Sequence, residues 1–226
     1  MSGVPYGPIL VVEDVPNIRE LLEVTLSFKG YPVMTARHGR EALEKIAIER
    51  PALIVSDILM PHLDGFGLTQ RLRIDPKTRD IPIILISATY VSKEDKDFAI
   101  KLGAIRFLEK PVDTDEFLLT VAEILTQGPP SVPDPITNEE FYKGYMVRLE
   151  NKLEQKNRQI LRTNRLLASL PEDQRPTFEA ILMEEIGYRD TIQNELTELK
   201  QLFEQNPSSE IPTTPTAPTG DADPKD

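Results

Sequence analysis

Residues 53–61 read LIVSDILMP, and the order of residue types in this stretch indicates the fold. A short apolar run is followed at once by a hydroxyl and a carboxylate, Ser56 and Asp57. An uninterrupted apolar run of this length is typical of a strand that is covered on both faces, as in a parallel sheet. Similar runs recur through the first half of the chain, at 9–12, 33–36, 81–86 and 107–108.

The segments between these runs have the spacing of helices. In the first of them, Ile18, Leu21, Leu22 and Leu26 recur three and four residues apart and form one apolar face. Comparable faces occur at 42–47, 66–72, 98–102 and 117–125. Strands that alternate with amphipathic helices predict an α/β domain over residues 8–126, with a doubly wound, five-stranded parallel sheet. We expect the flavodoxin-like strand order 2-1-3-4-5.

Composition excludes several classes of function. The chain of 226 residues has no Cys and only 2 His, which excludes disulfides, thiolate metal sites and Cys nucleophiles and argues against a multi-His metal site. The formal net charge of -11 argues against a surface that is basic throughout, as nucleic-acid binding favours. No apolar run approaches the roughly 20 residues of a membrane span, and no secretory signal is visible at the N-terminus. We therefore expect a cytoplasmic protein without membrane or nucleic-acid partners.

Proline divides the rest of the chain. Residues 127–136 contain four prolines and are expected to form a semi-rigid linker. Residues 137–206 are rich in charged residues with helical spacing. Residues 207–226 have one large aliphatic side chain and no aromatic one, so we expect a disordered tail.

Polar residues stand where four of the five predicted strands end. Glu13 and Asp14 follow the first run, Asp57 the third, Ser87 the fourth and Lys110 the fifth. Ligands bind at the carboxyl ends of the strands in an open parallel sheet, so these side chains should meet there. Clustered carboxylates favour a hard divalent cation, Mg²⁺ before Zn²⁺. A metal site, a cation and a nucleophilic carboxylate are the components of phosphoryl transfer.

Four of these residues also have a purely structural interpretation. Asp14 precedes Val15 and Pro16 and could cap a helix, Asp57 could cap a turn, Ser87 could bond its own backbone, and Lys110 could be an ordinary surface lysine. All of them stand at the same end of their own strands, however, and chance explains that poorly.

Residues 8–126 resemble the receiver domain of two-component response regulators. The matching segments are ILVVEDVP, LIVSDILMPHLDGFGL, IPIILISA and LGAIRFLEKPV, which occur in the family's order. The resemblance implies that Asp57 is phosphorylated by a histidine kinase or a histidine phosphotransfer protein. Such a receiver promotes only its own phosphorylation and dephosphorylation and is not an enzyme with a separate substrate.

The resemblance also implies roles for the neighbouring residues. Glu13, Asp14, Asp57 and the backbone carbonyl of Leu59 would hold Mg²⁺, and Lys110 would bind the phosphoryl oxygen. Ser87 and Phe107 stand at the two switch positions of the family: the hydroxyl would move onto the phosphoryl group, and the ring would turn inward. An alternative is that Phe107 is simply a core residue. Pro111 would follow a cis peptide. Leu59 and Thr89 predict slow loss of the phosphoryl group.

Residues 137–206 are expected to form two long helices, 137–170 and a second one that ends near residue 205. Apolar residues recur every seven positions in both, with polar interruptions such as Lys156, which is typical of a coiled coil or helical bundle. A pair of helices alone buries little surface, so we expect this module to form a homodimer. The alternative is an intramolecular hairpin that rests on the receiver domain.

The output of the protein remains open at this point. We expect a helical protein-interaction module controlled by Asp57, with an unidentified protein partner. The alternatives are an atypical DNA-binding transcription regulator and a phosphorelay shuttle. The first helix carries seven basic residues between positions 143 and 165, although such stripes are most often solvated flanks or protein-docking surfaces.

Overall fold

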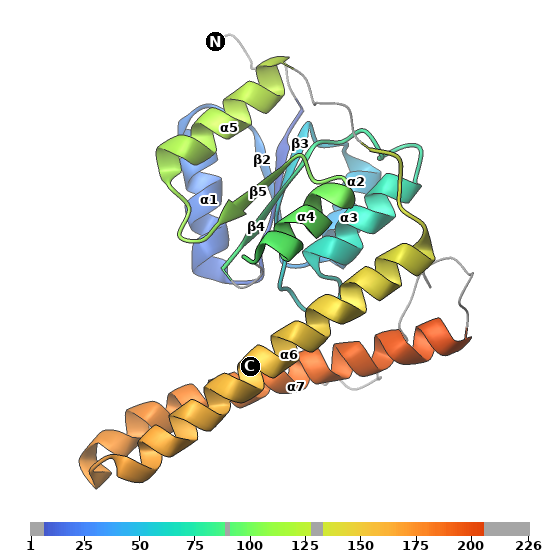
Figure 1. Ribbon diagram of the computed structural model, residues 1–226. Helices are drawn as coiled ribbons and strands as arrows, with labels where there is room; N and C mark the ends of the chain where they lie inside the picture. The colour runs from blue at the N-terminus through green and yellow to red at the C-terminus, as the bar shows by residue number, and fades with distance from the viewer. Residues whose placement is uncertain (1–6, 89–90, 128–132, 206–226) are drawn as a thin grey trace, which may run out of the picture.

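A computed structural model of the protein describes residues 7–88, 91–127 and 133–205. The first part is a three-layer α/β domain, and two long helices pack against it (Figure 1). The predicted tail, half of the predicted linker and Thr89 lie outside the described residues. No helix within the described ranges is long and apolar enough to cross a membrane.

The central sheet has the strand order β2-β1-β3-β4-β5, as predicted, and every neighbouring pair is parallel. In chain order the strands are β1 Ile9–Val12, β2 Val33–Ala36, β3 Leu53–Asp57, β4 Ile83–Ser87 and β5 Arg106–Glu109. Every residue of β1, β3 and β4 is buried. Uninterrupted apolar runs therefore mark the strands that are covered on both faces.

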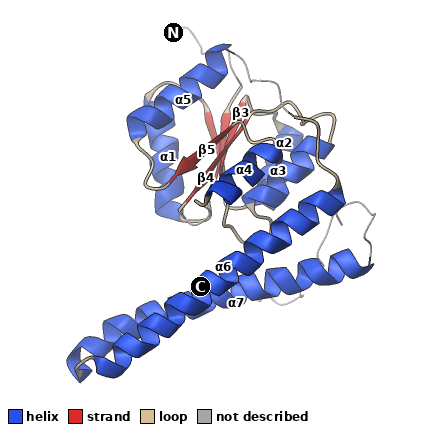
Figure 2. Ribbon diagram, in the orientation of Figure 1, coloured by secondary structure: helices blue, strands red, loops and turns tan. Residues whose placement is uncertain are grey.

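Helices cover both faces of the sheet (Figure 2). On one face lie α1 (Pro16–Phe28) and α5 (Thr114–Gln127), whose side chains Leu26, Phe117 and Val121 are buried against Val11 and Val55. The opposite face carries three helices: α2 (Gly39–Ile48), α3 (Gly65–Ile74) and α4 (Lys93–Lys101). This alternation is the doubly wound arrangement that the sequence predicts.

Side chains at the helix N-termini fix where several of these helices begin. His38 caps α2 by accepting from Glu41 N, at 3.2 Å, and Ser92 caps α4 by accepting from Asp95 N, at 3.1 Å. Asp64 caps α3 by accepting from Gly67 N, at 2.7 Å. Each cap satisfies a backbone donor that the first turn of a helix leaves open.

The C-terminal part is an antiparallel helical hairpin. Its helices are α6 (Asn138–Ser169) and α7 (Arg175–Gln205), joined through a short 3-10 turn, η1 (Glu172–Gln174). The start of α6 carries a capping box: Glu140 N donates to the Thr137 hydroxyl, and the Glu140 carboxylate accepts from Thr137 N. The two long helices predicted from the sequence are therefore present.

The first half of α6 packs on the α/β domain. Phe141, Tyr145 and Leu149 are buried in one hydrophobic core with Phe66 of α3 and Phe98 of α4. The rings of Phe98 and Phe66 meet edge to face, with centroids 5.2 Å apart. The intramolecular hairpin, which the sequence placed second to the homodimer, is thus what one chain forms.

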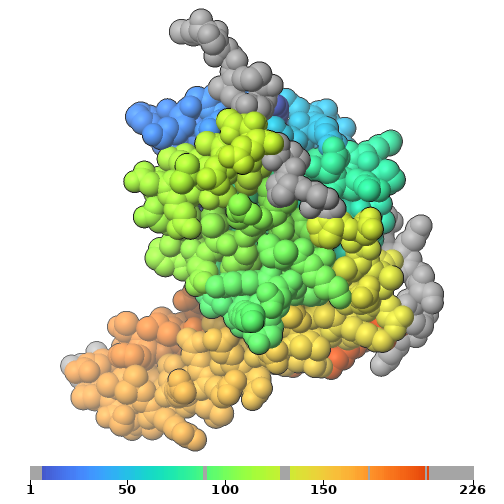
Figure 3. All heavy atoms as spheres, turned by 45° about the horizontal axis from the view of Figure 1, so that its top comes forward, coloured from blue at the N-terminus to red at the C-terminus, as the bar shows by residue number. Residues whose placement is uncertain are grey.

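The second half of the hairpin extends beyond the α/β domain (Figures 1 and 3). Ile160 is buried in this part of the hairpin, and Lys156 pairs with Glu185 at 2.7 Å across the two helices. Apolar side chains of this projecting part remain exposed: Leu161, Leu166, Ile181 and Met183. The single chain therefore leaves apolar surface on the far end of the hairpin.

Candidate functional site

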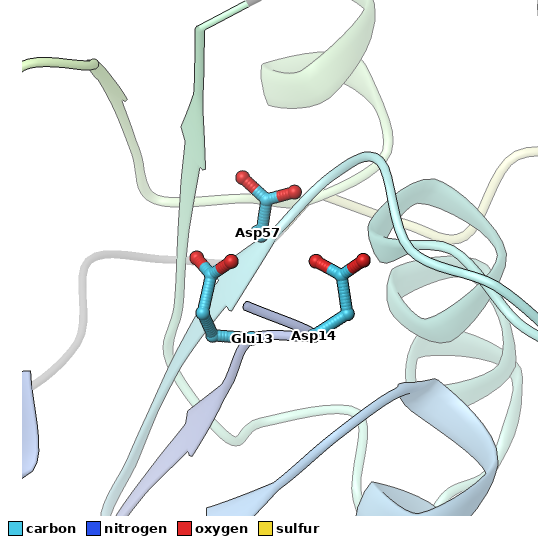
Figure 4. A group of neighbouring side chains, drawn as sticks. All are labelled: Glu13, Asp14 and Asp57. Atoms are coloured by element: carbon cyan, nitrogen blue, oxygen red, sulfur yellow. The ribbon is translucent and has the colours of Figure 1, made fainter. Parts of the chain in front are cut away.

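The predicted site lies at the carboxyl edge of the sheet. Glu13 and Asp14 directly follow β1, and Asp57 is the last residue of β3. Because β1 and β3 are neighbours, with Val12 paired to Ser56, these loops leave the sheet side by side. Figure 4 shows the carboxyl groups of Glu13, Asp14 and Asp57 around one common space, and one oxygen atom from each lies within 4.8 Å of the others.

Lys110, just after β5, completes this cluster. Its Nζ lies 2.7 Å from Glu13 Oε2 and 2.7 Å from Asp57 Oδ1. Both carboxylates are buried, with exposed side-chain fractions of 1% and 8%, and the lysine is 18% exposed. Burial of two like charges is costly unless a cation pairs with them, and Lys110 is that cation here. The interpretation of Lys110 as an ordinary surface lysine is therefore wrong.

Burial and charge move the pKa values at the site. Burial raises the pKa of Asp57 to about 6; Lys110 opposes this rise, and the charges of Glu13 and Asp14 add to it. Burial likewise raises the pKa of Glu13 against the pull of Lys110. Burial by itself would lower the pKa of Lys110, but the carboxylates of Asp57 and Glu13 reverse this and raise it. The lysine thus stays charged, while the pKa of Asp57 comes close to neutral pH.

The residues expected around this cluster lie close by. Ser87 ends β4, one strand beyond Asp57, and is buried. Phe107 lies in β5 and is half-buried against the core on the α3 and α4 side of the sheet. Leu59, also half-buried, follows Asp57 by two residues. The Lys110–Pro111 peptide is cis, as the resemblance implies.

Asp14 does not cap the helix that follows it. The N-cap of α1 is Val15, which makes no side-chain capping bond, and Pro16 begins the helix. The carboxylate of Asp14 is therefore available to the cluster, and its structural interpretation as a cap is wrong.

Sequence reasoning missed two supports of this site. The guanidinium of Arg19, one turn into α1, donates to the backbone carbonyls of Glu13, at 2.6 Å, and Asp14, at 3.3 Å. A Cβ on Gly65 would lie closer than 3.0 Å to the backbone oxygen of Asp57, so only glycine lets α3 begin this near the end of β3. For Arg19, its position five residues after Asp14, one turn into the predicted helix, was the only signal in the sequence that could have suggested this contact.

The donor set fits a hard divalent cation. Three carboxylates from two adjacent loops converge on one point, and oxygen ligands of this kind suit Mg²⁺. Glu13, Asp14, Asp57 and the carbonyl of Leu59 are the groups that could hold it. A bound cation would also relieve the mutual repulsion that helps to raise the pKa of Asp57.

Comparison with known proteins agrees with this geometry. The family model of the response regulator receiver domain matches residues 9–122. The "Probable transcriptional regulator ycf27" of Cyanophora paradoxa is 33% identical over 217 residues, which are 89% of this chain and 89% of that protein.

Two solved structures are similar over the α/β domain. The signal receiver domain of a histidine kinase from Syntrophus aciditrophicus has a TM-score of 0.51 and 35% identity, and the match covers 58% of this chain and 97% of that one. The chemotaxis protein CheY4 of Vibrio cholerae has a TM-score of 0.50 and 34% identity, with 53% and 99% covered. The fold, the acidic site and these matches together place the chain in the response regulator receiver family of two-component signalling proteins, with a helical hairpin after the receiver domain.

Proposed function

We propose that Asp57 accepts a phosphoryl group from a phosphohistidine on a histidine kinase or histidine phosphotransfer protein, in a reaction that depends on Mg²⁺. The observation that carries this proposal is the position of Lys110, whose Nζ lies 2.7 Å from both Glu13 and Asp57 at the carboxyl edge of the sheet. A nucleophilic carboxylate, a fixed cation and spare oxygen ligands occupy one point, which is what phosphoryl transfer requires.

The chemistry assigned to each residue follows from its charge. A carboxylate oxygen of Asp57 attacks phosphorus, the P–O bond forms, and the P–N bond to the imidazole of the donor breaks. Lys110 loses its pairing to the free carboxylate and pairs with a phosphoryl oxygen, while Ser87 donates a hydrogen bond to another. Glu13, Asp14, Asp57 and the Leu59 carbonyl would hold Mg²⁺, which supplies positive charge to the transferring group when bound.

The proposal is tested with a small phosphodonor such as phosphoramidate. Intact-mass measurement after incubation with Mg²⁺ should show one added phosphoryl group on the wild type and none on Asp57→Asn. Asp75→Asn, at the exposed C-terminal end of α3, is the matched control and should be phosphorylated as the wild type is. Phosphorylation of Asp57→Asn at the wild-type rate would refute the assignment.

We further propose that the helical hairpin is the output, acting on a protein partner and forming a homodimer through residues 137–206. The exposed apolar side chains on its projecting end, among them Leu161 and Met183, support a contact with a second copy. Sedimentation with Mg²⁺, with and without beryllofluoride, tests both ideas beside Asp57→Ala. A change in mass or shape in the wild type alone supports control of the hairpin by Asp57, and a monomer in all conditions refutes the dimer.

A second candidate is a DNA-binding transcription regulator, which the name of the Cyanophora relative favours. The basic residues of α6 argue against it, because most of them are engaged within the chain. Lys143 pairs with Glu139, Arg148 covers Phe98, Lys156 pairs with Glu185, Arg158 pairs with Glu154, and Lys152 is buried. An affinity for duplex DNA that falls steeply with salt would support this candidate.

A further inference from the structure

A cluster of three polar side chains lies where the hairpin meets the receiver domain. The hydroxyl of Tyr145, on α6, is hydrogen-bonded both to Asp64 Oδ2, at the start of α3, and to Glu195 Oε1, on α7. Asp64 and Tyr145 are each 4% exposed, and Glu195 is half-buried. One hydroxyl thus bridges a carboxyl group of the receiver domain and a carboxyl group of the second hairpin helix.

The number of protons at this cluster follows from its hydrogen-bond inventory. A phenol has one hydrogen to donate, and an ionised carboxylate can only accept. Tyr145 can therefore donate to one of the two carboxyl groups, and the other must itself carry a proton and donate to the phenol oxygen. Asp64 already accepts from Gly67 N, which favours its ionised form. The proton then belongs on Glu195.

We propose that the contact between hairpin and receiver domain holds one proton, shared through Tyr145 by Asp64 and Glu195, so that docking of the hairpin takes up a proton from solution. This device is distinct from the phosphorylation of Asp57 and operates in the unphosphorylated protein. It makes the docked hairpin sensitive to pH through a single pair of carboxyl groups.

The surrounding acidic charges act in the same direction. Burial raises the pKa of Asp64, the charge of Glu195 adds to this rise whenever that group is ionised, and the charge of Asp57, at the end of β3, raises it further. Burial also raises the pKa of Glu195, and the charge of Glu198 adds to that rise. Acidic neighbours on β3 and α7 thus both help to retain the proton.

Several basic groups of the elements packed around the cluster have partners of their own, as Lys200 of α7 has in Glu150 of α6. Arg148 and Lys152, which follow Tyr145 along α6, interact with Asp95 of α4, and Arg71 of α3 interacts with Tyr142. Positive charge at the cluster would favour two ionised carboxylates, and the engagement of these groups with other partners weakens that effect.

The sign of the pH effect follows directly. When the hairpin leaves the receiver domain, both carboxyl groups enter water, where they are ionised at neutral pH. The docked state binds one proton more, so docking is fully favourable at low pH and weakens as the pH rises from the ordinary pKa of the carboxyl toward its raised value. Over that range, one proton of linkage changes the equilibrium constant by up to about tenfold per pH unit.

The first test is infrared spectroscopy of the full-length, unphosphorylated protein at neutral pH. The difference spectrum between the wild type and Glu195→Gln should contain the C=O stretch of one protonated carboxyl group. The substitution keeps the contact, because the new amide donates to the phenol oxygen as the acid does, and it removes the titratable proton. Glu179→Gln, at an exposed position of α7 that is 16 residues before Glu195, is the control, and its difference spectrum should lack that band.

The second test compares unfolding equilibrium constants in urea at several pH values. The unfolding equilibrium constant of the wild type, divided by that of Glu195→Gln, should rise by up to about tenfold for each pH unit above the ordinary carboxyl pKa. Asp64→Asn should give the same result by a second route, because Asn also caps helices and its amide can donate to Tyr145. Difference spectra without an acid band for both variants, or a ratio of constants that does not change with pH, would overturn the proposal.

Discussion

Gly144 offers a direct test of how the hairpin sits. It lies within α6, where Ala would ordinarily stabilise a helix by about 0.5–1 kcal/mol. In this structure, however, a Cβ on Gly144 would lie closer than 3.0 Å to Cε2 of the Phe98 ring, whereas ordinary contacts begin at 3.4 Å. The ring is held by Phe66 at one edge and by the guanidinium of Arg148, 4.4 Å from its centroid, so it cannot simply turn away.

The magnitude follows from two opposing effects. Overpacking a well-filled core costs about 1–3 kcal/mol, and the helix gains about 0.5–1 kcal/mol from Ala. Gly187 is the matched control, because it lies within α7 and a Cβ there would meet nothing within 4 Å. We therefore expect Gly187→Ala to raise the free energy of unfolding, and Gly144→Ala to be about 1–3 kcal/mol less stable than Gly187→Ala.

Urea denaturation of the two full-length variants measures this difference, and hydrogen exchange of α4 locates it. Loss of docking should expose α4 amides in Gly144→Ala and leave them protected in Gly187→Ala. Equal stabilisation by the two substitutions would refute the packing of α6 on Phe98 and would favour a hairpin whose face at Gly144 is free.

Three further predictions concern the acidic site. Lys110→Met removes the cation that lowers the pKa of Asp57, so a larger fraction of Asp57 is protonated and cannot attack phosphorus. Phosphorylation at neutral pH, measured by intact mass with a small phosphodonor, should slow by about tenfold for each unit by which the pKa of Asp57 comes to exceed the pH. Without Mg²⁺, carbon NMR should show the Asp57 carboxyl titrating near its raised pKa of about 6, and added Mg²⁺ should lower the midpoint of that titration. Because the folded protein holds the Asp57 proton more tightly than the unfolded chain does, protonation of Asp57 stabilises the fold at low pH, and this stabilisation is lost as the pH rises from the ordinary carboxyl pKa through the raised value. Gly65→Ala places a Cβ against the backbone oxygen of Asp57, so the backbone at the end of β3 must shift. We expect the free energy of unfolding to fall by about 1–3 kcal/mol and phosphorylation to slow. An unchanged melting temperature would contradict this prediction.

The receiver domain could be predicted from sequence because its signals are local. Each buried strand is a short apolar run, and each predicted site residue stands just after its own run or at its end, as Asp57 does in β3. A parallel sheet brings the carboxyl ends of its strands to one edge whatever the details of packing. The topology therefore implied that Glu13, Asp57 and Lys110 would meet, and only the distances among them needed the structure.

The hairpin could not be placed in the same way. Seven-residue spacing in α6 predicts an apolar seam but does not say what covers it, because a second chain and the receiver domain satisfy it equally. Tyr145 and Glu195 belong to no motif identified in the sequence, and Tyr145 stands 81 residues from Asp64 and 50 residues from Glu195 in the chain.

Hydrophobic periodicity within single elements was thus enough to predict the strands and helices, and the known topology of doubly wound sheets supplied the strand order and the residues expected at the carboxyl edge. Three-dimensional packing, in contrast, was needed to show that α6 docks on Phe66 and Phe98 and that Tyr145 joins two carboxyl groups. The physical reason is that the burial of a polar group depends on what surrounds it in space. Nothing in the sequence marks Asp64 as a partner of the helical hairpin, and its part in a shared proton follows from neighbours that folding brings to it.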